Sequence, residues 1–549
     1  MAPLRSTPLR PLLDRYLIPI AGFLLTVMCG TQIGSAIVES PTNDEPIHLT
    51  ASYIYLTKGR YNMDLPHPPL GRVLAALPLL ALPLNRIPAE KAWPEFRTFI
   101  WGNRVSVDTI MLRARLVTIA LTLLFGAWLC WWTRRHFGPA AALLALTFFT
   151  FDPNLIAHGH YVTTDLIVSF GIFLTCTLWA DFLLTPSWKR LILAALALGM
   201  ATLSKYSALF LLLVLPVLYF VAWTRNRSRP FFTWRGAIIT FVVMGAGAGI
   251  LVALAYAPDV VTIIHLLRAE RITAINSHTL VSSFGYFRGL RQVAQHNAEG
   301  NPAYLLGHLG QYGWWDYFPV AFLVKIPTGV FAACGIAALS LLKFRLRPPP
   351  ALLWLCLALP PLIFFTLAMC SSIDIGVRYI LPVYPFLYVL LAVVLIDYAP
   401  LLLRSAWPWT VAALMLLVAV ESLSNYPHYL AFFNWASGGA ANGSHYLLDS
   451  NLDWGQDSKN LANFVRDHHV TPLCTALFGT APGNYYVSGS RNLNQTGIPE
   501  GVGHLPCVVA VSVNFLHGLY IPPAVFAPLR QRQPMAEIGH SIYLYDLRH

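Results

Sequence analysis

Charged residues are scarce in this sequence. They make up 11% of its 549 residues, whereas hydrophobic residues make up 56%. An ordinary soluble domain carries about 25% charged residues, so water is not the main solvent of this chain. The formal net charge of +12 does not indicate a nucleic-acid partner, because most Lys and Arg residues stand in short gaps between apolar segments.

Several binding motifs are also missing. The sequence has no CxxC motif and no Cys/His cluster with zinc spacing, which argues against a structural metal site. It has no Walker-type phosphate loop and no GxGxxG motif that could bind a nucleotide. Cys474 and Cys507 stand outside the apolar stretches that hold the other cysteines. They could pair in an oxidising, exported compartment.

Long apolar segments are what the chain has in abundance. A transmembrane helix needs about 20 mostly apolar residues, and about eleven segments approach this requirement. We expect spans at residues 17–38, 116–133, 139–151, 164–184, 191–203, 207–223, 237–257, 318–342, 351–370, 379–396 and 408–423. The sequence thus predicts an all-α polytopic membrane protein.

The basic residues of the short loops predict the orientation. Such residues stay in the cytoplasm, and every second loop is basic if the N-terminus is cytoplasmic. The alternate short loops contain only Lys205 and Arg378. The C-terminus is then extracytoplasmic, and the long segments 39–115 and 258–317 are outer loops in which function should be sought.

The tail has a different pattern. Strand-like runs at 473–478, 507–513 and 542–545 alternate with a helix-like run at 458–469. We therefore expect a transmembrane module over residues 1–425 and a small extracytoplasmic α/β domain over residues 426–549.

Two adjacent carboxylates open the first outer loop. Asp44 precedes Glu45 and Pro46, a pattern typical of a helix N-terminus with an acidic cap. The same pair also suits a general base at the membrane surface, which would take a proton from an attacking hydroxyl. The two interpretations are compatible.

Cations follow on the same predicted side. Lys205 and Arg378 interrupt the positive-inside pattern, and Arg72 begins an apolar run. Each could extend to the lipid headgroups, and Arg378 could pair with Asp374. Cations held at the outer surface also suit a lipid phosphate such as polyprenyl phosphate.

The second outer loop is dense in polar residues. His158 and His160 suggest metal ligation, but alternate spacing alone is weak evidence, and we assign no metal ligand. A divalent cation stays a possible cofactor. Asp165 stands at the mouth of a span, where an ionisable group is costly unless it is paired or functional.

These motifs resemble the polyprenyl-phosphate-dependent GT-C glycosyltransferases, in the branch with the protein O-mannosyltransferases and the lipid A aminoarabinose transferase. Asp44-Glu45 resembles the acidic pair of the first outer loop, and residues 67–72 are similar to an HPPLGK segment, with Arg72 in place of Lys. Further similar elements are Thr164-Asp165, Ser204-Lys205 and the RYILP run that begins at Arg378. The large lumenal sugar-binding insertion of the mannosyltransferases is lacking.

The resemblance implies a role for each matching residue. Asp44 would be the catalytic base and Glu45 would support it. Lys205, Arg378 and Arg72 would bind the donor phosphate, and the supporting residues would be Asp165, His67, His158 and His160.

The predicted function is sugar transfer from a polyprenyl-phosphate donor to an acceptor hydroxyl on a protein, lipid or glycan, in an inner (plasma) membrane. A lipid-linked glycan transporter, which needs no base, is one alternative. A ligase that uses a diphosphate-linked donor is another.

Overall fold

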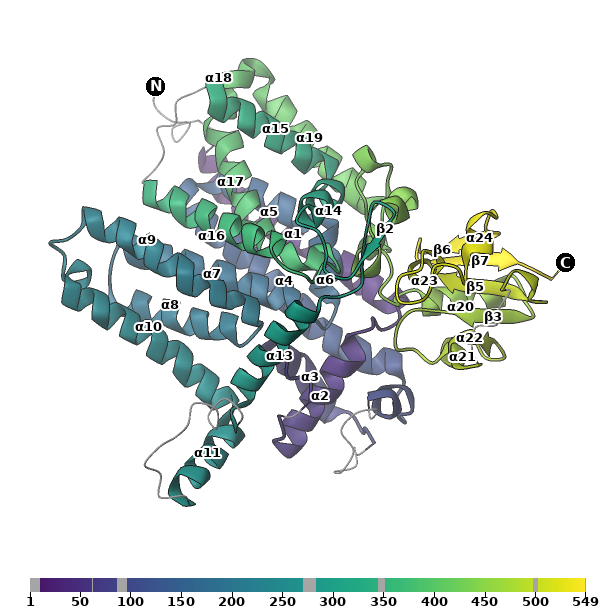
Figure 1. Cartoon of the computed structure of the whole chain (residues 1–549). Helices are drawn as coiled ribbons and strands as arrows, with labels where there is room; N and C mark the ends of the chain where they lie inside the picture. Colours follow the sequence, from purple (N-terminus) through teal and green to yellow (C-terminus); the bar gives the residue numbers. More distant parts are fainter. Residues whose placement is uncertain are drawn as a thin grey trace.

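The computed structural model describes residues 10–61, 63–85, 96–269, 283–343, 351–496 and 502–548. Most of them form a bundle of helices, and the C-terminal residues form a small unit of strands and short helices beside it (Figure 1). Parts of the two predicted outer loops, residues 86–95 and 270–282, lie outside the described residues.

Seven helical segments in the described ranges are long and apolar enough to cross a membrane. They are α1 (Arg10–Val38), α4 (Val107–Phe137), α7 (Asp165–Leu184), η4 with α9 (Tyr206–Phe210, Leu211–Arg225), α10 (Trp234–Ala255), α16 (Ala351–Met369), and α18 to α19 (Ala399–Leu403, Trp407–Leu423). Two bent pairs raise this number to nine, namely α5 (Pro139–Thr150) with α6 (Pro153–His160), and α14 (Tyr317–Lys325) with α15 (Thr328–Lys343). The prediction of a multi-pass helical membrane protein is confirmed.

The remaining predicted spans form shorter helices. Residues 191–203 and 379–396 fall in α8 (Trp188–Thr202) and α17 (Val383–Asp397), each of 15 residues. Both are shorter than the usual bilayer span of about 20 residues. Every span predicted from hydropathy therefore corresponds to a helix. Because some of these helices are short, fewer of them are long enough to cross a membrane.

The bends have local causes. Helices α14 and α15 meet at 108° around Ile326 and Pro327. A proline disfavours helical backbone in the residue before it, and Ile326 is extended, with φ −78° and ψ 135°. At the 65° bend before α6, the Asp152 side chain accepts a hydrogen bond from the Leu155 amide at 2.9 Å and caps a new helix.

Helix α7 lies at the centre of the bundle, and 89% of its most apolar 18-residue stretch is buried. Small residues allow its neighbours to approach closely. A Cβ added at Gly171 would lie 2.8 Å from the Ala201 Cα of α8, and one at Gly199 would lie 3.1 Å from the Ala248 Cα of α10. This packing fixes the start of α7 and the end of α8, where Asp165 and Lys205 stand.

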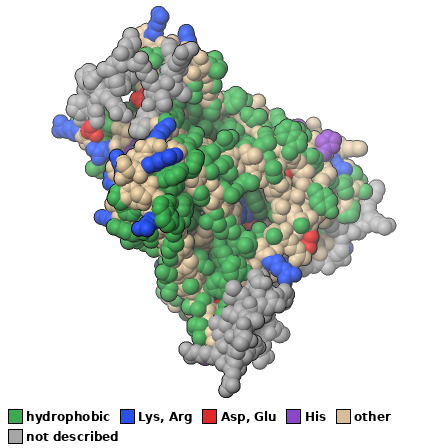
Figure 2. Space-filling view, turned by 60° about the vertical axis from the view of Figure 1, so that its left-hand side comes forward, with side chains coloured by type: hydrophobic (Ala, Val, Ile, Leu, Met, Phe, Trp, Pro, Cys, Tyr) green, Lys and Arg blue, Asp and Glu red, His purple; other side chains and the backbone are tan. Residues whose placement is uncertain are grey.

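Large apolar side chains cover much of the bundle surface. They include Val242, Ile250 and Leu254 of α10, all of which are exposed. Figure 2 shows such residues across a broad part of one face, with Lys and Arg gathered mainly toward one end. Soluble proteins rarely expose so large an apolar surface, so this face suits contact with lipid.

The C-terminal unit is a five-stranded sheet with the order β4-β3-β5-β7-β6. Strand β3 (Leu473–Ala476) is parallel to β4 (Arg491–Asn492) and β5 (Val508–Ser512), whereas β7 (Ile542–Asp546) is antiparallel to β5 and β6 (Ala536–Ile538). Helix α20 (Ser458–Asp467) precedes the sheet. The strand-like and helix-like runs of the tail thus have the predicted structure.

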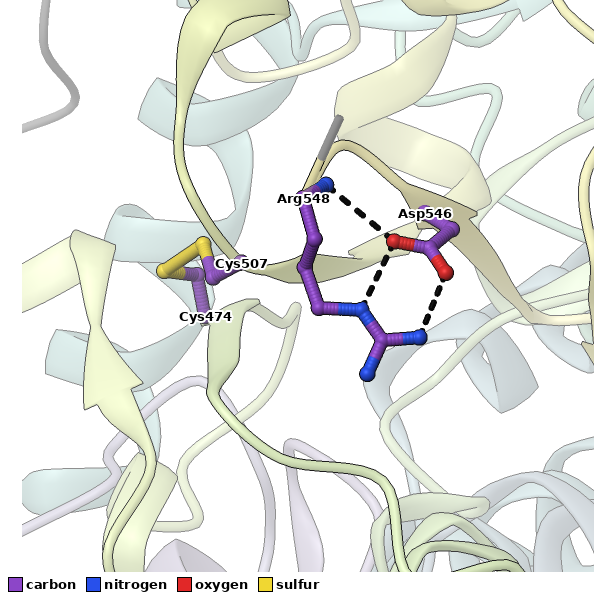
Figure 3. The surroundings of a disulfide bond; sticks show 4 residues. All are labelled: Cys474, Cys507, Asp546 and Arg548. Atoms are coloured by element: carbon purple, nitrogen blue, oxygen red, sulfur yellow. Dashed lines mark hydrogen bonds and ion pairs between the residues drawn. A yellow bond between two sulfur atoms is a disulfide. The ribbon is translucent and has the colours of Figure 1, made fainter.

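A disulfide joins strand β3 to the residue just before β5. Cys474 in β3 and Cys507 just before β5 are bonded, with their Cα atoms 6.0 Å apart. Figure 3 shows the bond near the end of the chain, where Arg548 pairs with Asp546. The pairing of these two cysteines, which the sequence left open, is therefore present.

The segment between bundle and sheet packs into the bundle itself. Residues such as Tyr429, Leu448 and Trp454 belong to the large hydrophobic core of the helices. The Lys325 Nζ donates to the carbonyl oxygens of Leu430, Phe432 and Asn451 at 2.6–2.9 Å. These hydrogen bonds connect the tail to the bundle. The division of the chain into two domains at residue 426 stays a prediction.

A short hairpin makes a second connection to the tail. Strand β1 (Ala303–Leu305) pairs with β2 (His308–Gly310), and Leu305 forms a bridge to Leu447. Helices α11 (Ala257–Ala269) and α13 (Gly285–Glu299) precede this hairpin, and α2 (Glu45–Lys58) and α3 (Leu70–Ala76) belong to the first predicted outer loop.

Candidate active site

Four of the predicted site residues meet at one end of the bundle. Asp44 follows α1, Asp165 begins α7, Lys205 follows α8, and Arg378 lies in the short helix η6 (Val377–Ile380) before α17. Ion pairs join all four side chains, so these helix ends lie together.

The four charges alternate in sign. The Arg378 Nη1 lies 2.9 Å from the Asp44 Oδ2 and 3.6 Å from the Asp165 Oδ2. The Lys205 Nζ lies 2.5 Å from the other oxygen of Asp165. Two carboxylates therefore balance two cations, and an incoming phosphate would have to compete with these carboxylates for the cations.

Asp44 does not act as a helix cap. It occupies the N-cap position of α2, but its side chain makes no capping hydrogen bond and bonds Arg378 instead. Burial raises the pKa of Asp44. The positive charges around it, of which Arg378 has the largest effect, outweigh burial and lower the pKa below its usual value. Asp44 is thus ionised at neutral pH.

Arg378 has capacity for another ligand. Its guanidinium carbon lies 4.2 Å from the ring centre of Trp454, and its Nε is buried without a hydrogen-bond partner among the described residues. Burial disfavours its charge, but Asp44 and Asp165 raise the pKa of Arg378 above the usual value. An unpaired guanidinium donor beside a cavity is well placed to bind an anion.

Glu45 points away from this group. Its carboxylate pairs with Arg115 of α4 at 2.6 Å, and both side chains are fully buried. Arg115 also donates to the carbonyl oxygens of Ala36, Glu39 and Ser40, which end α1 and lead to Asp44. This pair therefore holds the segment that carries Asp44.

A second cluster lies beside Asp44. Asp64 accepts hydrogen bonds from the Nδ1 atoms of His48 and His67, at 2.7 and 2.6 Å. Burial lowers the pKa of His67, although Asp64 opposes this effect, and the contact with Asp64 favours the tautomer whose Nδ1–H is the donor. Among the described residues, these three form the group that lies close enough to share a metal ion.

Arg72 contacts two residues of that cluster. It is 1% exposed, and it donates to the Tyr61 hydroxyl at 2.7 Å and to the His67 carbonyl at 3.1 Å. Its Nη1 lies 3.7 Å from Asp64. It does not line the cavity that the other two predicted phosphate ligands line.

His158 and His160 are buried in α6 and do not come together around a site. The His160 ring contacts Glu39 at 2.7 Å and the Ile156 carbonyl at 2.9 Å, so both of its nitrogens have partners. His158 packs against Trp454, at 5.9 Å between ring centres.

A cavity of about 860 Å³ connects the charged group with the helices. Asp44, Asp165, Lys205 and Arg378 line its polar part together with His48 and His67. Apolar residues from two candidate spans line the cavity as well, namely Leu209, Phe210, Leu213, Phe364, Leu367 and Ala368. Figure 2 shows a hollow in the hydrophobic face in which Lys or Arg atoms are visible.

The sequence interpretation missed several residues of this site. His48 stands four positions after Asp44, a spacing that brings side chains to one helix face, so this residue could have been found. Asp64 and Tyr520 carried no local signal, whereas Asp449 and Trp454 stand in one polar segment that was interpreted as a turn before a helix.

Comparisons with known proteins bear on this site. Residues 45–258 match the family model described as dolichyl-phosphate-mannose-protein mannosyltransferase. The match confirms the predicted resemblance over a region that includes Glu45, His67, Asp165 and Lys205, whereas Asp44 stands just before it and Arg378 beyond it. No curated protein matches the sequence.

Solved structures show a distant likeness. ArnT from Cupriavidus metallidurans bound to undecaprenyl phosphate is 14% identical with a TM-score of 0.48, and the alignment covers 95% of this chain and 97% of that one. ArnT in the apo state gives a TM-score of 0.49 at 14% identity and covers 97% of both chains. The oligosaccharyltransferase AglB from Archaeoglobus fulgidus, in complex with an inhibitory peptide and a dolichol-phosphate, gives 0.43 at 12% identity over 95% of this chain and 74% of that one.

Proposed function

We propose that this protein is a membrane glycosyltransferase that moves a sugar from a polyprenyl-phosphate carrier to an acceptor hydroxyl. The observation that carries the proposal is the cavity in which an ionised carboxylate, Asp44, and two cations, Lys205 and Arg378, stand together with apolar side chains of two candidate spans. The family match over residues 45–258 supports the same reaction class.

Each part of the cavity suits one part of such a donor. Lys205 and Arg378 would hold the phosphate, because cations near a leaving group stabilise the charge that develops as it departs. The apolar side chains from η4, α9 and α16 would contact the prenyl chain. Asp44 would accept the proton of the acceptor hydroxyl as that oxygen attacks the anomeric carbon, in a single displacement that inverts the configuration.

The ion pairs also suggest how donor binding prepares the base. Arg378 lowers the pKa of Asp44, against the effect of burial, and makes this carboxylate a weak base. A phosphate bound to Arg378 would offset part of this positive charge. The pKa of Asp44 would then rise toward its usual value, so the carboxylate becomes a better proton acceptor when the donor is in place.

The remaining predicted residues would have supporting roles. Glu45, through Arg115, would hold the segment before α2, and Arg72 would hold Asp64 against His48 and His67. If the enzyme uses a divalent cation, this last group is where it would bind. We further propose that the cavity faces the outside of a bacterial inner membrane and that the N-terminus is cytoplasmic, following the basic loops.

The test is sugar release from labelled polyprenyl-phosphate donors by the purified protein, with a mannosyl donor first and a cell-envelope extract as acceptor. Asp44→Asn should lower turnover by about 100-fold or more, because it removes a general base, while donor binding persists. Asp467→Asn is the matched control, since Asp467 is an exposed residue of the C-terminal unit that pairs with its neighbour Arg466.

The other outcomes separate the alternatives. Equal turnover in wild type and Asp44→Asn would remove Asp44 from the mechanism. Donor binding without turnover in either protein would favour a lipid-linked glycan transporter. Turnover with diphosphate-linked donors alone would favour a ligase.

A further inference from the structure

The C-terminal unit forms part of the cavity wall. Phe478, which follows β3, and Tyr520, which follows α23 (Val513–Leu516), line the same cavity as Asp44. Their rings are stacked, with centres 5.3 Å apart and planes inclined by 9°. Tyr520 is 40% exposed, so its ring is not simply buried in a core. The stack thus offers a flat aromatic surface to whatever fills this part of the cavity.

Polar groups surround this stack. The Tyr520 hydroxyl donates to the carboxylate of Asp449, which also lines the cavity. The Asp449 carboxylate accepts a second hydrogen bond from the Ser450 amide at 2.6 Å, and the Asp449 amide is held by Asn514 at 2.8 Å. Asn301 and Asn297 line the cavity as well. Acceptors and donors therefore stand next to the aromatic rings.

The backbone at both polar residues is unusual. Asp449 has φ 57° and Tyr520 has φ 69°. A bulky residue such as Tyr rarely adopts positive φ, because its Cβ crowds the backbone, and such a conformation persists only where the surroundings impose it. Tyr520 has this conformation at a cavity wall, where it is bonded to Asp449, and strain of this kind gathers at ligand sites.

A sugar ring has the matching chemistry. A pyranose presents an apolar face of C–H groups, which packs on aromatic rings, and a rim of hydroxyls, which bind carboxylates, phenols and amides. We propose that Asp449, Phe478 and Tyr520 form a pyranose-binding subsite, so that the C-terminal unit selects the sugar. This inference rests on the proposed glycosyltransferase function, and the ring could come from the donor or from a glycan acceptor.

The position of the subsite agrees with that reaction. Arg378 packs on Trp454, which lines the same cavity, and its charge lowers the pKa of Asp449 while burial raises it. The subsite therefore lies within electrostatic reach of the proposed phosphate ligand. A sugar attached to a phosphate at Arg378 could contact the C-terminal unit while its anomeric carbon stays near Asp44.

The experiment compares two lipids on the full-length protein. The first is polyprenyl phosphate without sugar, and the second is the sugar-bearing donor that turns over in the Asp44 experiment. Tyr520→Ala should weaken binding of the sugar-bearing donor by about tenfold relative to the sugar-free lipid. Tyr520→Phe, which keeps the ring and removes only the hydroxyl, should have a smaller effect of about fivefold. Tyr485→Ala is the control, because Tyr485 is a similarly exposed tyrosine of the same unit that does not line the cavity.

The outcomes show whether the bound sugar ring belongs to the donor or to the acceptor, and which of the two proposals is wrong. If Tyr520→Ala raises the KM of a glycan acceptor and leaves both lipid affinities unchanged, the ring belongs to the acceptor. Two results would overturn the subsite: binding of both lipids weakened equally, or no change in any substrate constant. The enzyme proposal would still stand if Asp44→Asn lowers turnover as expected. A wild-type protein that neither binds nor turns over any sugar-bearing lipid would overturn both.

Discussion

The guanidinium of Arg378 lies 2.9 Å from the carboxylate of Asp44, although the two residues stand 334 positions apart in the sequence. This pair joins the start of α2 to the short helix η6, and Asp165 extends it to Lys205. The proposed base and the proposed phosphate ligands are thereby parts of one electrostatic network, in which a change at one residue is felt by the others.

Substitution of Arg378 by Lys should impair donor binding. Lysine keeps the positive charge but has a single ammonium, which cannot bridge Asp44 and Asp165 and still offer a free donor to phosphate. We expect the KM for the donor to rise by about tenfold or more, the usual effect of losing a charge-assisted hydrogen bond. Arg466→Lys, at an exposed arginine of the C-terminal unit, should leave the KM unchanged. An unchanged KM in Arg378→Lys would exclude Arg378 as a phosphate ligand.

Substitution of Glu45 by Gln should act through stability. Arg115 would remain buried without its counter-charge, which typically costs about 3–5 kcal/mol. The midpoint of thermal unfolding in detergent should fall, and turnover should decrease with the amount of folded protein. Asp44→Asn should unfold closer to the wild-type temperature, because its side chain is 22% exposed. A Glu45→Gln protein with normal thermal stability and no turnover would instead assign Glu45 a direct part in the reaction.

Sugar affinity should depend on pH through Asp449. Burial raises the pKa of this carboxyl to about 6, against the opposing effects of Tyr520 and Arg378. As the pH falls through about 6, Asp449 gains a proton and becomes a weaker acceptor for sugar hydroxyls, so the KM for the sugar-bearing substrate should rise. Asp44, with its lowered pKa, contributes no step in this range. The same step in Asp449→Asn would assign the pH dependence to another group.

The disulfide should stabilise the C-terminal unit and leave the bundle unaffected. The bond closes a loop of 33 residues, and the chain-entropy estimate for such a loop is roughly 3–4 kcal/mol. Limited proteolysis of a Cys474→Ser/Cys507→Ser protein should therefore cut the sheet faster while the helices stay protected. Cys370→Ser, at an exposed free cysteine, provides the control. Equal cleavage rates in all three proteins would show that the bond contributes little.

The two adjacent residues of the acidic motif have different partners in the structure. Asp44 and Glu45 were one acidic pair in the sequence, yet consecutive residues on a helix point about 100° apart, and here one meets Arg378 while the other meets Arg115. The expectation that Arg378 pairs with Asp374 was wrong, because the Asp374 carboxylate instead accepts a hydrogen bond from the Trp314 amide at 2.6 Å.

The sequence by itself determined the membrane class, the positions of the helices and the strands of the tail. Hydropathy and strand patterning are local properties, and burial of apolar side chains in lipid or in a sheet dominates the energy of each segment. Only the tertiary structure decided which carboxylate meets which cation, how Arg72 turns away from the cavity, and that Asp449 and Tyr520 reach the site from the tail. Contacts between residues hundreds of positions apart depend on how the helices pack, and no pattern within one segment encodes that packing.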